Sequence, residues 1–543
     1  MRLFLASLFT IILLSGFLIA IFLSLLYFAG IIEIYFTIGL TIIINFILWL
    51  LGPKISDFIY GFFYKVRWID IDDLKKISQA SADIILRVCK KYNFKIPKLG
   101  IILDKNPNAF TYGSGRWNSR IIVTEGIFTY LDEKERASVF AHELGHIKNR
   151  DFIIMTIAST LLQILYELYV ISKRLSDRNG NRRKSSGAFS IIMIISYIFF
   201  WIGRYVVLYL SRIREYYADE FSAKETDPNF LSSALIKISY GILVNPDDVR
   251  LINSTQFIGI TDFKLSKNIG MVYYNCANLK DFKPLQKALI FDIKNPWAFI
   301  MELNSTHPLT GKRLKRLSQM SNRPLFNFNK IEKEMNIDNK KLYLNFLKDV
   351  FVVLLPSFII IIFPILFILM YSTFSFVSIA LFSSFWLFLI GLSILFTTIY
   401  KYPNKIPENS NVLELMSDIY ASPVRGKPVK LSGKLIGKGI PGLIFSEDMM
   451  MQDRTGLIFL NYESWLPIIG NLFFGLKKVP KLINKDAEIT GWFLRGMYPI
   501  IGLNTLKTKE EMIRGFVKLG GIIIGFGLII LSLLLFFVLY FLI

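Results

Sequence analysis

Seven long apolar runs constrain this chain more than any other feature of its sequence. A segment of about 20 apolar residues is long enough to cross a bilayer as a helix, and 53% of the 543 residues are hydrophobic. The runs are Leu3–Phe28, Ile31–Leu51, Phe152–Ile171, Ala188–Leu210, Val350–Tyr371, Phe374–Tyr400 and Phe516–Ile543. We therefore expect a polytopic α-helical membrane protein. The first run is too long for a signal-peptide core, so we interpret it as an uncleaved anchor.

The apolar runs separate three polar regions, at residues 52–151, 211–349 and 401–515. The remaining segments are three predicted transmembrane hairpins and a single C-terminal span, at residues 1–51, 152–210, 350–400 and 516–543. Because a hairpin returns the chain to the side from which it entered, all three polar regions are expected on one side. The formal charge is +22, and the positive-inside rule then makes that side cytoplasmic.

One loop opposes this topology. The connection between the third and fourth runs contains one acidic residue, Asp177, and the basic residues Lys173, Arg174, Arg178, Arg182, Arg183 and Lys184. If both runs cross the bilayer, this loop lies outside, where basic residues are disfavoured. Either the two runs do not cross completely, or the rule is broken here.

The basic charge has two interpretations with different partners. Lysine and arginine held against anionic lipid explain it directly. Nucleic-acid binding would require a recognition motif beside the charge, and the sequence contains none that we recognise. We therefore expect the lipid bilayer as a partner and no nucleic acid.

The third polar region has a pattern unlike the first two. Short apolar runs broken by glycine and proline predict strands, and Asp453–Gly456 predicts a hairpin turn. The predicted strands are Pro428–Ile436, Met449–Gln452, Leu457–Tyr462 and Ala487–Phe493. We expect a small β-rich domain, for which an OB-like barrel is a candidate.

Two of the chain's three histidines stand four residues apart, in the block His142-Glu143-Leu144-Gly145-His146. On a helix both imidazoles face the same way, so they can bind one metal ion. Glu143 between them is placed to take the proton of a metal-bound water. Asp132 and Glu135 predict a capping box at the start of this helix. Gly145 is a weak helix former, and we interpret it as leaving room beside the metal.

A zinc hydrolase usually has three protein ligands and leaves one position for water. The third histidine is His307, and the next candidates are the carboxylates that follow the fourth apolar run. Glu215 and Asp219 are four apart and share one helix face. One of them can bind Zn²⁺ while the other orients a ligand histidine.

With these pieces assembled, the chain resembles the HtpX family of membrane zinc metallopeptidases and, more distantly, the CAAX prenyl proteases. The similarity extends over roughly residues 60–320 and the placement of the first four runs. Its matching pieces are Asn106–Phe110, Ala141–Asp151, Ser211–Asp219 and Thr306–Thr310. After about residue 350 the chain departs from the short members of the HtpX family, and the resemblance implies nothing about residues 401–515.

The resemblance implies a role for each matching residue. His142, His146 and Glu215 would bind one Zn²⁺ per chain, with Asp219 orienting a ligand. Glu143 would be the catalytic base, and His307 would stabilise the oxyanion. Asn108, Ala109 and Phe110 would lie on an edge strand that holds an extended substrate, which agrees with the general ability of a sheet edge to bind peptide backbone.

The sequence therefore predicts a mainly helical zinc-metallopeptidase domain, formed by residues 52–151 and 211–349 with a small edge-strand sheet, and a β-rich C-terminal domain. Its function would be hydrolysis of polypeptide substrates by a membrane-bound zinc endopeptidase with a cytoplasmic active site. The family resemblance implies damaged membrane proteins as substrates. Two alternatives remain: a catalytically inactive scaffold, and a receptor that binds through residues 401–515.

Overall fold

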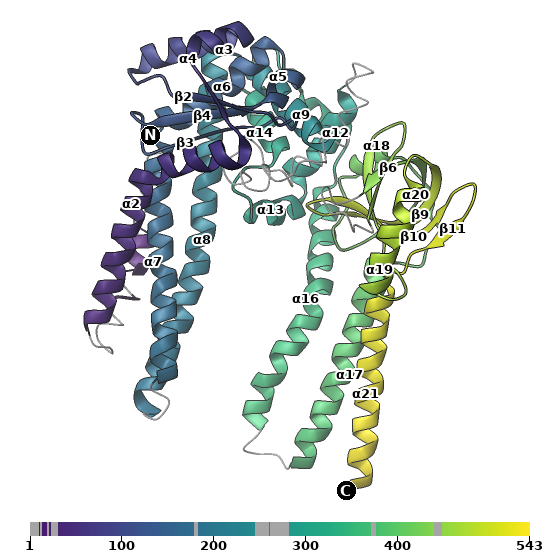
Figure 1. Ribbon diagram of the computed structural model, residues 1–543. Helices are drawn as coiled ribbons and strands as arrows, with labels where there is room; N and C mark the ends of the chain where they lie inside the picture. Colours follow the sequence, from purple (N-terminus) through teal and green to yellow (C-terminus); the bar gives the residue numbers. More distant parts are fainter. Residues whose placement is uncertain are drawn as a thin grey trace. The chain divides into compact units, whose positions relative to one another are not determined.

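The computed structural model describes residues 10, 13–18, 21–22, 31–178, 183–244, 260, 282–370, 376–438 and 448–542. These residues form two compact units. The N-terminal unit comprises residues 1–266 and 300–327, and the C-terminal unit comprises residues 267–299 and 328–543. Figure 1 shows the helices and strands of both units.

Six helices of the described chain are long and apolar enough to cross a membrane. They are Tyr35–Tyr64, Asp151–Ser176, Phe189–Glu225, Asn339–Ile368, Leu381–Lys401 and Leu519–Leu539. They coincide with six of the seven apolar runs, and the first run, residues 3–28, lies mostly outside the described residues. The protein is a multi-pass membrane protein, as its sequence predicts.

The N-terminal unit is mainly helical and contains one small sheet. Its elements are α2 (Ile31–Tyr64), β1 (Arg67–Ile69), α3 (Ile71–Ile77), α4 (Gln79–Tyr92), β2 (Lys98–Ile102), β3 (Ala109–Gly113), β4 (Ser119–Thr124), α5 (Glu125–Tyr130), α6 (Glu133–Lys148), α7 (Asp151–Arg178), α8 (Arg183–Glu225), α9 (Pro228–Val244) and α14 (Thr310–Ser318). Helix α13 (Pro296–Leu303) belongs partly to each unit.

The sheet has the strand order β1-β2-β4-β3, so β3 lies at one edge. β3 pairs antiparallel with β4, with Ala109 opposite Val123 and Phe110 opposite Ile122. The apolar face of the sheet is closed by a cluster in which Ile102, Phe110 and Ile122 are buried against Tyr60 and Trp68. Ala109 and Phe110 therefore lie on an edge strand as predicted, and Asn108 directly precedes it.

Several helices run past the boundaries that hydropathy predicts. Helix α2 continues from the second apolar run to Tyr64 with Pro53 inside it, and α8 continues from the fourth run to Glu225. A helix ends where its backbone finds a cap or where packing ends, and not where its hydrophobicity changes. As a consequence, Glu215 and Asp219 stand on the same helix as the membrane span.

The C-terminal unit combines membrane helices with a barrel. Its helices are α12 (Lys283–Lys294), α15 (Phe328–Glu334), α16 (Asn339–Met370), α17 (Phe376–Lys401), α18 (Val412–Met416), α19 (Ile469–Phe473), the π-helical turn η1 (Phe474–Lys478), α20 (Val479–Leu482) and α21 (Leu519–Leu542). Its strands are β5 (Glu408–Asn409), β6 (Lys427–Lys438), β7 (Met449–Gln452), β8 (Leu457–Asn461), β9 (Asp486–Arg495), β10 (Pro499–Lys507) and β11 (Met512–Arg514).

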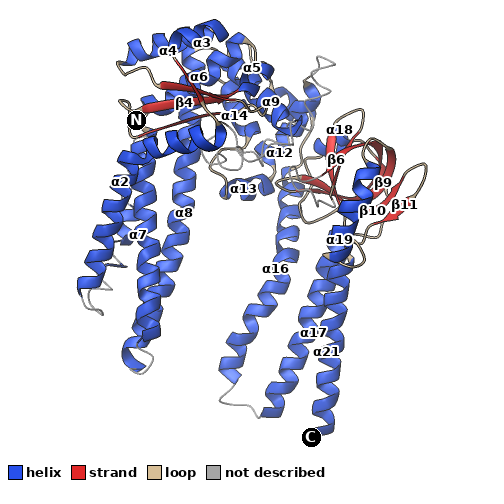
Figure 2. Ribbon diagram, in the orientation of Figure 1, coloured by secondary structure: helices blue, strands red, loops and turns tan. Residues whose placement is uncertain are grey.

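Five of these strands close on themselves, and Figure 2 draws the strands of this unit in red. β6, β7 and β8 pair antiparallel in sequence. β8 then pairs parallel with β10, β10 pairs antiparallel with β9, and β9 returns to β6. The predicted β-rich domain is a closed five-stranded barrel. Sequence reasoning did not predict β10, which completes the ring.

Glycines bring two membrane helices of this unit into close contact. A Cβ atom on Gly391 of α17 would lie 2.7 Å from the carbonyl oxygen of Gly525 on α21. Farther along the same pair, Ser384 and Ser532 each donate a hydrogen bond to the other's carbonyl at 2.7 Å. Small residues at such contacts let helices pack where lipid removes the hydrophobic driving force.

Candidate metal centre

Helix α6 carries the histidine motif in the interior of the N-terminal unit. Asp132 caps it, and Glu135 completes the predicted capping box. His142 is fully buried and Glu143 is 1% exposed. Gly145 does not leave room beside the motif as we predicted, because a Cβ there would lie 3.1 Å from Cα of Ala218. The glycine instead lets α8 approach α6 closely.

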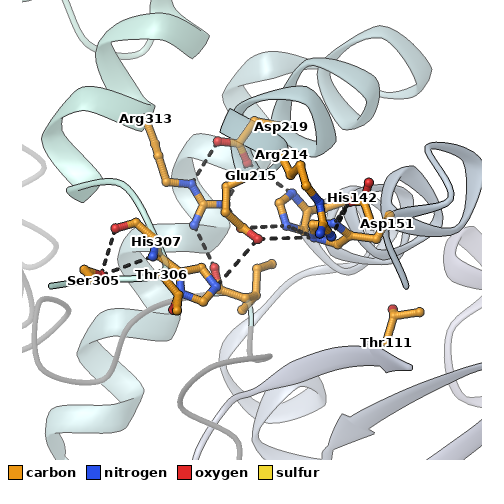
Figure 3. Close-up of polar contacts among 12 residues, drawn as sticks. Thr111, His142, Asp151, Arg214, Glu215, Asp219, Ser305, Thr306, His307 and Arg313 are labelled. Atoms are coloured by element: carbon orange, nitrogen blue, oxygen red, sulfur yellow. Dashed lines mark hydrogen bonds and ion pairs between the residues drawn. The ribbon is translucent and has the colours of Figure 1, made fainter. Parts of the chain in front are cut away.

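This close approach brings three side chains together. Nε2 of His142 and Nε2 of His146 are 3.3 Å apart. Each lies 3.5 Å from a carboxylate oxygen of Glu215. The three ligand atoms all lie within 4.8 Å of one another and could hold a metal ion. Figure 3 shows Glu215 projecting from α8 towards His142.

A second carboxylate orients each histidine. Nδ1 of His142 lies 3.1 Å from Oδ1 of Asp219, and Nδ1 of His146 lies 2.6 Å from Oδ2 of Asp151. Carboxylates at the outer nitrogen fix the tautomer and turn the other nitrogen towards a metal. Sequence reasoning placed Asp219 beside the site and missed Asp151, although Asp151 ends the Ala141–Asp151 block.

Two arginines pair with these orienting carboxylates. Arg313 donates to both oxygens of Asp219, at 2.8 and 2.6 Å, from α14. Arg214 lies 2.9 Å from Oδ2 of Asp151. Burial opposes the charge of Arg313, but Asp219 and the neighbouring Glu215 hold the pKa of Arg313 above its usual value. Sequence reasoning found neither arginine, because pairing across helices leaves no local pattern.

The donor set fits a zinc ion. Two imidazole nitrogens and one carboxylate are three ligands that leave a position for water. Among the described residues Oε2 of Glu215 accepts no hydrogen bond although it is buried, and a buried carboxylate oxygen normally has a partner. Burial lowers the pKa of His142, yet Asp219 and Glu215 together raise it to about 9. Metal binding would therefore release a proton from this imidazole.

Glu143 projects from the same helix and meets the edge strand. The hydroxyl of Thr111 on β3 donates a hydrogen bond to the Glu143 carboxylate. Thr111 stands two positions after Ala109 and was missed at the sequence level. The contact joins the general-base candidate to the strand that would bind substrate.

The three residues predicted to bind substrate differ in what they can offer. Phe110 is fully buried in the sheet's core and pairs with Ile122 of β4, so its side chain is not open to a ligand. The backbone N–H of Ala109 is bonded to the side chain of Asn108 at 2.9 Å. The Ala109 carbonyl accepts a hydrogen bond from the N–H of Ile260 at 2.9 Å, and Arg313 donates to the Ile260 carbonyl at 2.7 Å. The backbone of Ile260 thus links β3 to Arg313 on α14, and the backbone of another peptide could make the same two bonds.

His307 lies next to the group of three but outside it. Its Nε2 is 3.7 Å from Oε1 of Glu215, and its Nδ1 is 2.9 Å from the hydroxyl of Thr306. Arg212 of α8 donates to the carbonyls of Glu302 and Ser305, each at 2.8 Å. The helix that carries Glu215 therefore also holds the loop that carries His307; Figure 3 shows His307 beside Glu215.

Comparisons with known proteins bear on the same part of the chain. Residues 78–321 match Peptidase family M48. A protein named Protease HtpX homolog from Aquifex aeolicus is 32% identical over 286 residues, which are 51% of this chain and 80% of the relative. Protease HtpX homolog 2 from Methanosarcina mazei is 30% identical over 240 residues, 44% of this chain and 71% of the relative. A crystal structure of S. mikatae Ste24p is similar over 58% of this chain and 66% of its own, with 17% identity and a TM-score of 0.35.

Proposed function

Because the chain belongs to peptidase family M48, whose HtpX proteases are among its relatives, we propose that it is a membrane-bound, zinc-dependent endopeptidase. His142, His146 and Glu215 would hold one Zn²⁺ per chain. The observation that carries the proposal is the convergence of their three ligand atoms within 4.8 Å beside the buried carboxylate of Glu143. A scaffold without activity would have no need of a buried glutamate there.

Zinc bound at this site would supply a Lewis acid and would lower the pKa of a bound water towards neutrality. Glu143 takes the proton of the attacking water and passes it to the leaving amine. Thr111 keeps the Glu143 carboxylate directed at β3 through its hydroxyl hydrogen bond. His307 donates a hydrogen bond to the oxygen that becomes negative during attack.

The substrate would lie along β3 as an additional strand. Backbone hydrogen bonds hold any extended peptide irrespective of its sequence, and Asn108, Ala109 and Phe110 offer the start of that edge. Ile260 of this chain already makes backbone hydrogen bonds of this kind to Ala109 and Arg313, so a substrate strand at this edge would take its place. We propose membrane and membrane-proximal proteins as substrates, in quality control.

The decisive experiment compares Glu143→Gln with the wild-type protein. The amide cannot accept a proton, so cleavage of casein should fall by about 10³ while zinc content stays stoichiometric. Glu133→Gln is the matched control, because it lies on the same helix with a side chain 46% exposed. Wild-type cleavage by Glu143→Gln would reject the mechanism. Cleavage by neither protein would favour the scaffold alternative.

We also propose that the site faces the cytoplasm. A single cysteine at Lys76, whose side chain is 77% exposed in the N-terminal unit, provides the test in a variant without Cys89 and Cys276. A membrane-impermeant thiol reagent should label it in inverted vesicles and not in intact cells. Labelling in intact cells would reverse the proposed topology.

We propose that the closed barrel is OB-like. Its five strands form one ring, and helical segments α19, η1 and α20 stand between the third and fourth strands. OB barrels serve as binding modules, so a receptor role for residues 401–515 is the second candidate function. Deleting these residues should leave casein cleavage intact if the barrel only recruits substrates.

A further inference from the structure

The connection between β8 and β9 exposes an unusual number of large apolar side chains. We call residues 465–476 the apolar connection. Trp465 is 64% exposed and Ile468 is 82% exposed. The other exposed members are Leu466, Ile469, Leu472, Phe473 and Leu476. A contiguous group of this kind marks a surface that something covers.

The opposite face of the apolar connection is already packed on the barrel. Phe474 is buried and stacks on Tyr462 with ring centroids 3.7 Å apart. Val479 and Leu482, which follow, are fully buried. The segment is therefore apolar on both faces, and a helix that is apolar all round belongs in a fully apolar environment. The barrel provides one half of that environment.

Hydrogen bonds attach the apolar connection to the start of a membrane helix. The N–H of Phe516 donates to the carbonyl of Glu463 at 2.8 Å, three residues before α21 begins at Leu519. Asn471 donates to the Glu463 carboxylate at 2.9 Å and accepts from the N–H of Ser464 at 2.7 Å. Figure 1 shows α19 beside the upper end of α21. The exposed side chains thus lie where the apolar helix enters the bilayer.

The charge and amino-acid composition of this segment also suit a position at the membrane surface. Lys477 and Lys481 follow the apolar side chains, whereas Lys478 pairs with Glu511, and no acidic residue occurs from residue 464 to residue 485. Lysines beside a membrane attract anionic headgroups. Tryptophan is enriched at the interface because one part of its ring is apolar and the other can stay wet.

The backbone is strained at Ile468, the most exposed large apolar residue of the apolar connection. Ile468 has φ 69° and ψ −72°, and the N–H of Ile469 donates to the carbonyl of Pro467 at 2.9 Å, which is a γ-turn of the rare, strained type. Such strain persists where the surrounding structure imposes it, which is common at functional surfaces. Ile468, the strained residue, is also the most exposed large apolar side chain of the apolar connection.

We propose that the apolar connection inserts into the boundary between headgroups and acyl chains of an anionic bilayer. Shallow insertion of an apolar helical face beside basic residues is the physical behaviour of interfacial segments. The barrel is then held against the membrane at a second point besides its covalent link to α17 and α21, which fixes the face it presents. This inference holds whether or not the chain is a peptidase.

The test uses the full chain in nanodiscs that contain phosphatidylglycerol. In a variant with Cys89→Ala and Cys276→Ala, single cysteines replace Ile469 or Phe473 and carry an environment-sensitive fluorophore. Spin-labelled lipid should quench both fluorophores, and their emission should shift to shorter wavelength. The control is Arg454→Cys, in the exposed turn before β8. The five-residue strand β8 spans about 17 Å at roughly 3.3 Å per residue and separates this control from the apolar connection.

Two results would overturn the proposal. If aqueous iodide quenches the fluorophores at 469 and 473 as strongly as at 454, the connection stays in water. If neither iodide nor spin-labelled lipid reaches them, protein covers the surface. Lys477→Gln with Lys481→Gln tests the headgroup contribution. Lipid quenching should then fall to its level in phosphatidylcholine nanodiscs, and unchanged quenching would refute the role of anionic lipid.

Discussion

The two units bury arginine in different ways. In the N-terminal unit Arg313 is 1% exposed and forms a two-pronged pair with Asp219. In the C-terminal unit Arg495 is 2% exposed and donates to the backbone carbonyls of Met416 and Ala288, the latter at 2.8 Å. Its guanidinium lies 3.9 Å from the ring centre of Phe291, and burial lowers its pKa to about 10.

Arg313 is part of a network of charged residues around the candidate metal site, whereas Arg495 has a structural role. Arg313 compensates a carboxylate that orients His142, so its charge acts on the candidate metal ligands. Arg495 joins α12, the end of α18 and β9 through hydrogen bonds that depend on shape. Removing one partner of a buried charge pair leaves an uncompensated charge, whereas removing Arg495 leaves unsatisfied carbonyls. Substitutions around Arg313 should therefore change zinc content and cleavage, whereas substitution of Arg495 should change the stability of the C-terminal unit.

The largest effect is expected for Glu215→Ala. This substitution removes a ligand atom, so zinc and cleavage should both be lost. Metal analysis of the purified protein measures the first and casein hydrolysis the second. Glu220→Ala is the matched control, because Glu220 stands on the same helix and pairs at the surface with Lys224. Stoichiometric zinc in Glu215→Ala would show that another carboxylate is the ligand.

His307→Phe should keep its zinc and lose turnover. An oxyanion donor typically contributes about 10²–10³ to the rate, and His307 lies outside the group of three ligands. Measuring zinc content and casein turnover on the same preparation separates the two roles. A metal-free His307→Phe protein would instead identify His307 as a ligand.

Asp151→Asn should weaken the metal site without removing it. The amide orients His146 less firmly and leaves Arg214 without its carboxylate, so zinc affinity should fall about 10–100-fold. Competition with a chelator measures this loss, and Asp219→Asn should resemble it through His142. Asp83→Asn, on the exposed face of α4, is the control. Unchanged affinity in both site variants would mean that packing alone orients the histidines.

Arg495→Ala should have the smallest effect on catalysis and a clear effect on the C-terminal unit. Two buried carbonyls lose their donor at about 1–3 kcal/mol each, partly offset because a charge is no longer buried. Limited proteolysis should cut the barrel faster, while zinc content and casein cleavage stay at wild-type levels. Loss of zinc from this variant would contradict the independence of the two units.

Local signals in the sequence predicted the elements that depend on near neighbours. The capping box at Asp132 and the strand Met449–Gln452 appear where they were predicted. Strand β10 was missed because its first residue is a proline and its partners, β8 and β9, are chosen by barrel closure. Hydrophobic periodicity and turn residues depend on a few neighbouring residues, whereas closure of the barrel depends on strands from the whole domain.

Arg204 illustrates how a local argument can omit a partner. An arginine inside an apolar run suggests a watery cavity or a snorkelling side chain. In the structure its guanidinium lies 4.8 Å from the ring centre of Trp201, one turn away on the same helix. A cation over an indole face is a favourable pairing that hydropathy does not register.

The amino-acid sequence by itself determined the membrane helices, the histidine helix and the carboxylates that could complete a metal site, because all three follow from spacing along a helix. Spacing alone leaves the choice between Glu215 and Asp219 open; in the tertiary structure Glu215 faces both Nε2 atoms and Asp219 faces Nδ1 of His142. The tertiary structure also brought in Asp151, Thr111 and Arg313 from three other elements. The physical reason is that orientation of a side chain is set by partners packed across the fold, and their sequence separation is arbitrary.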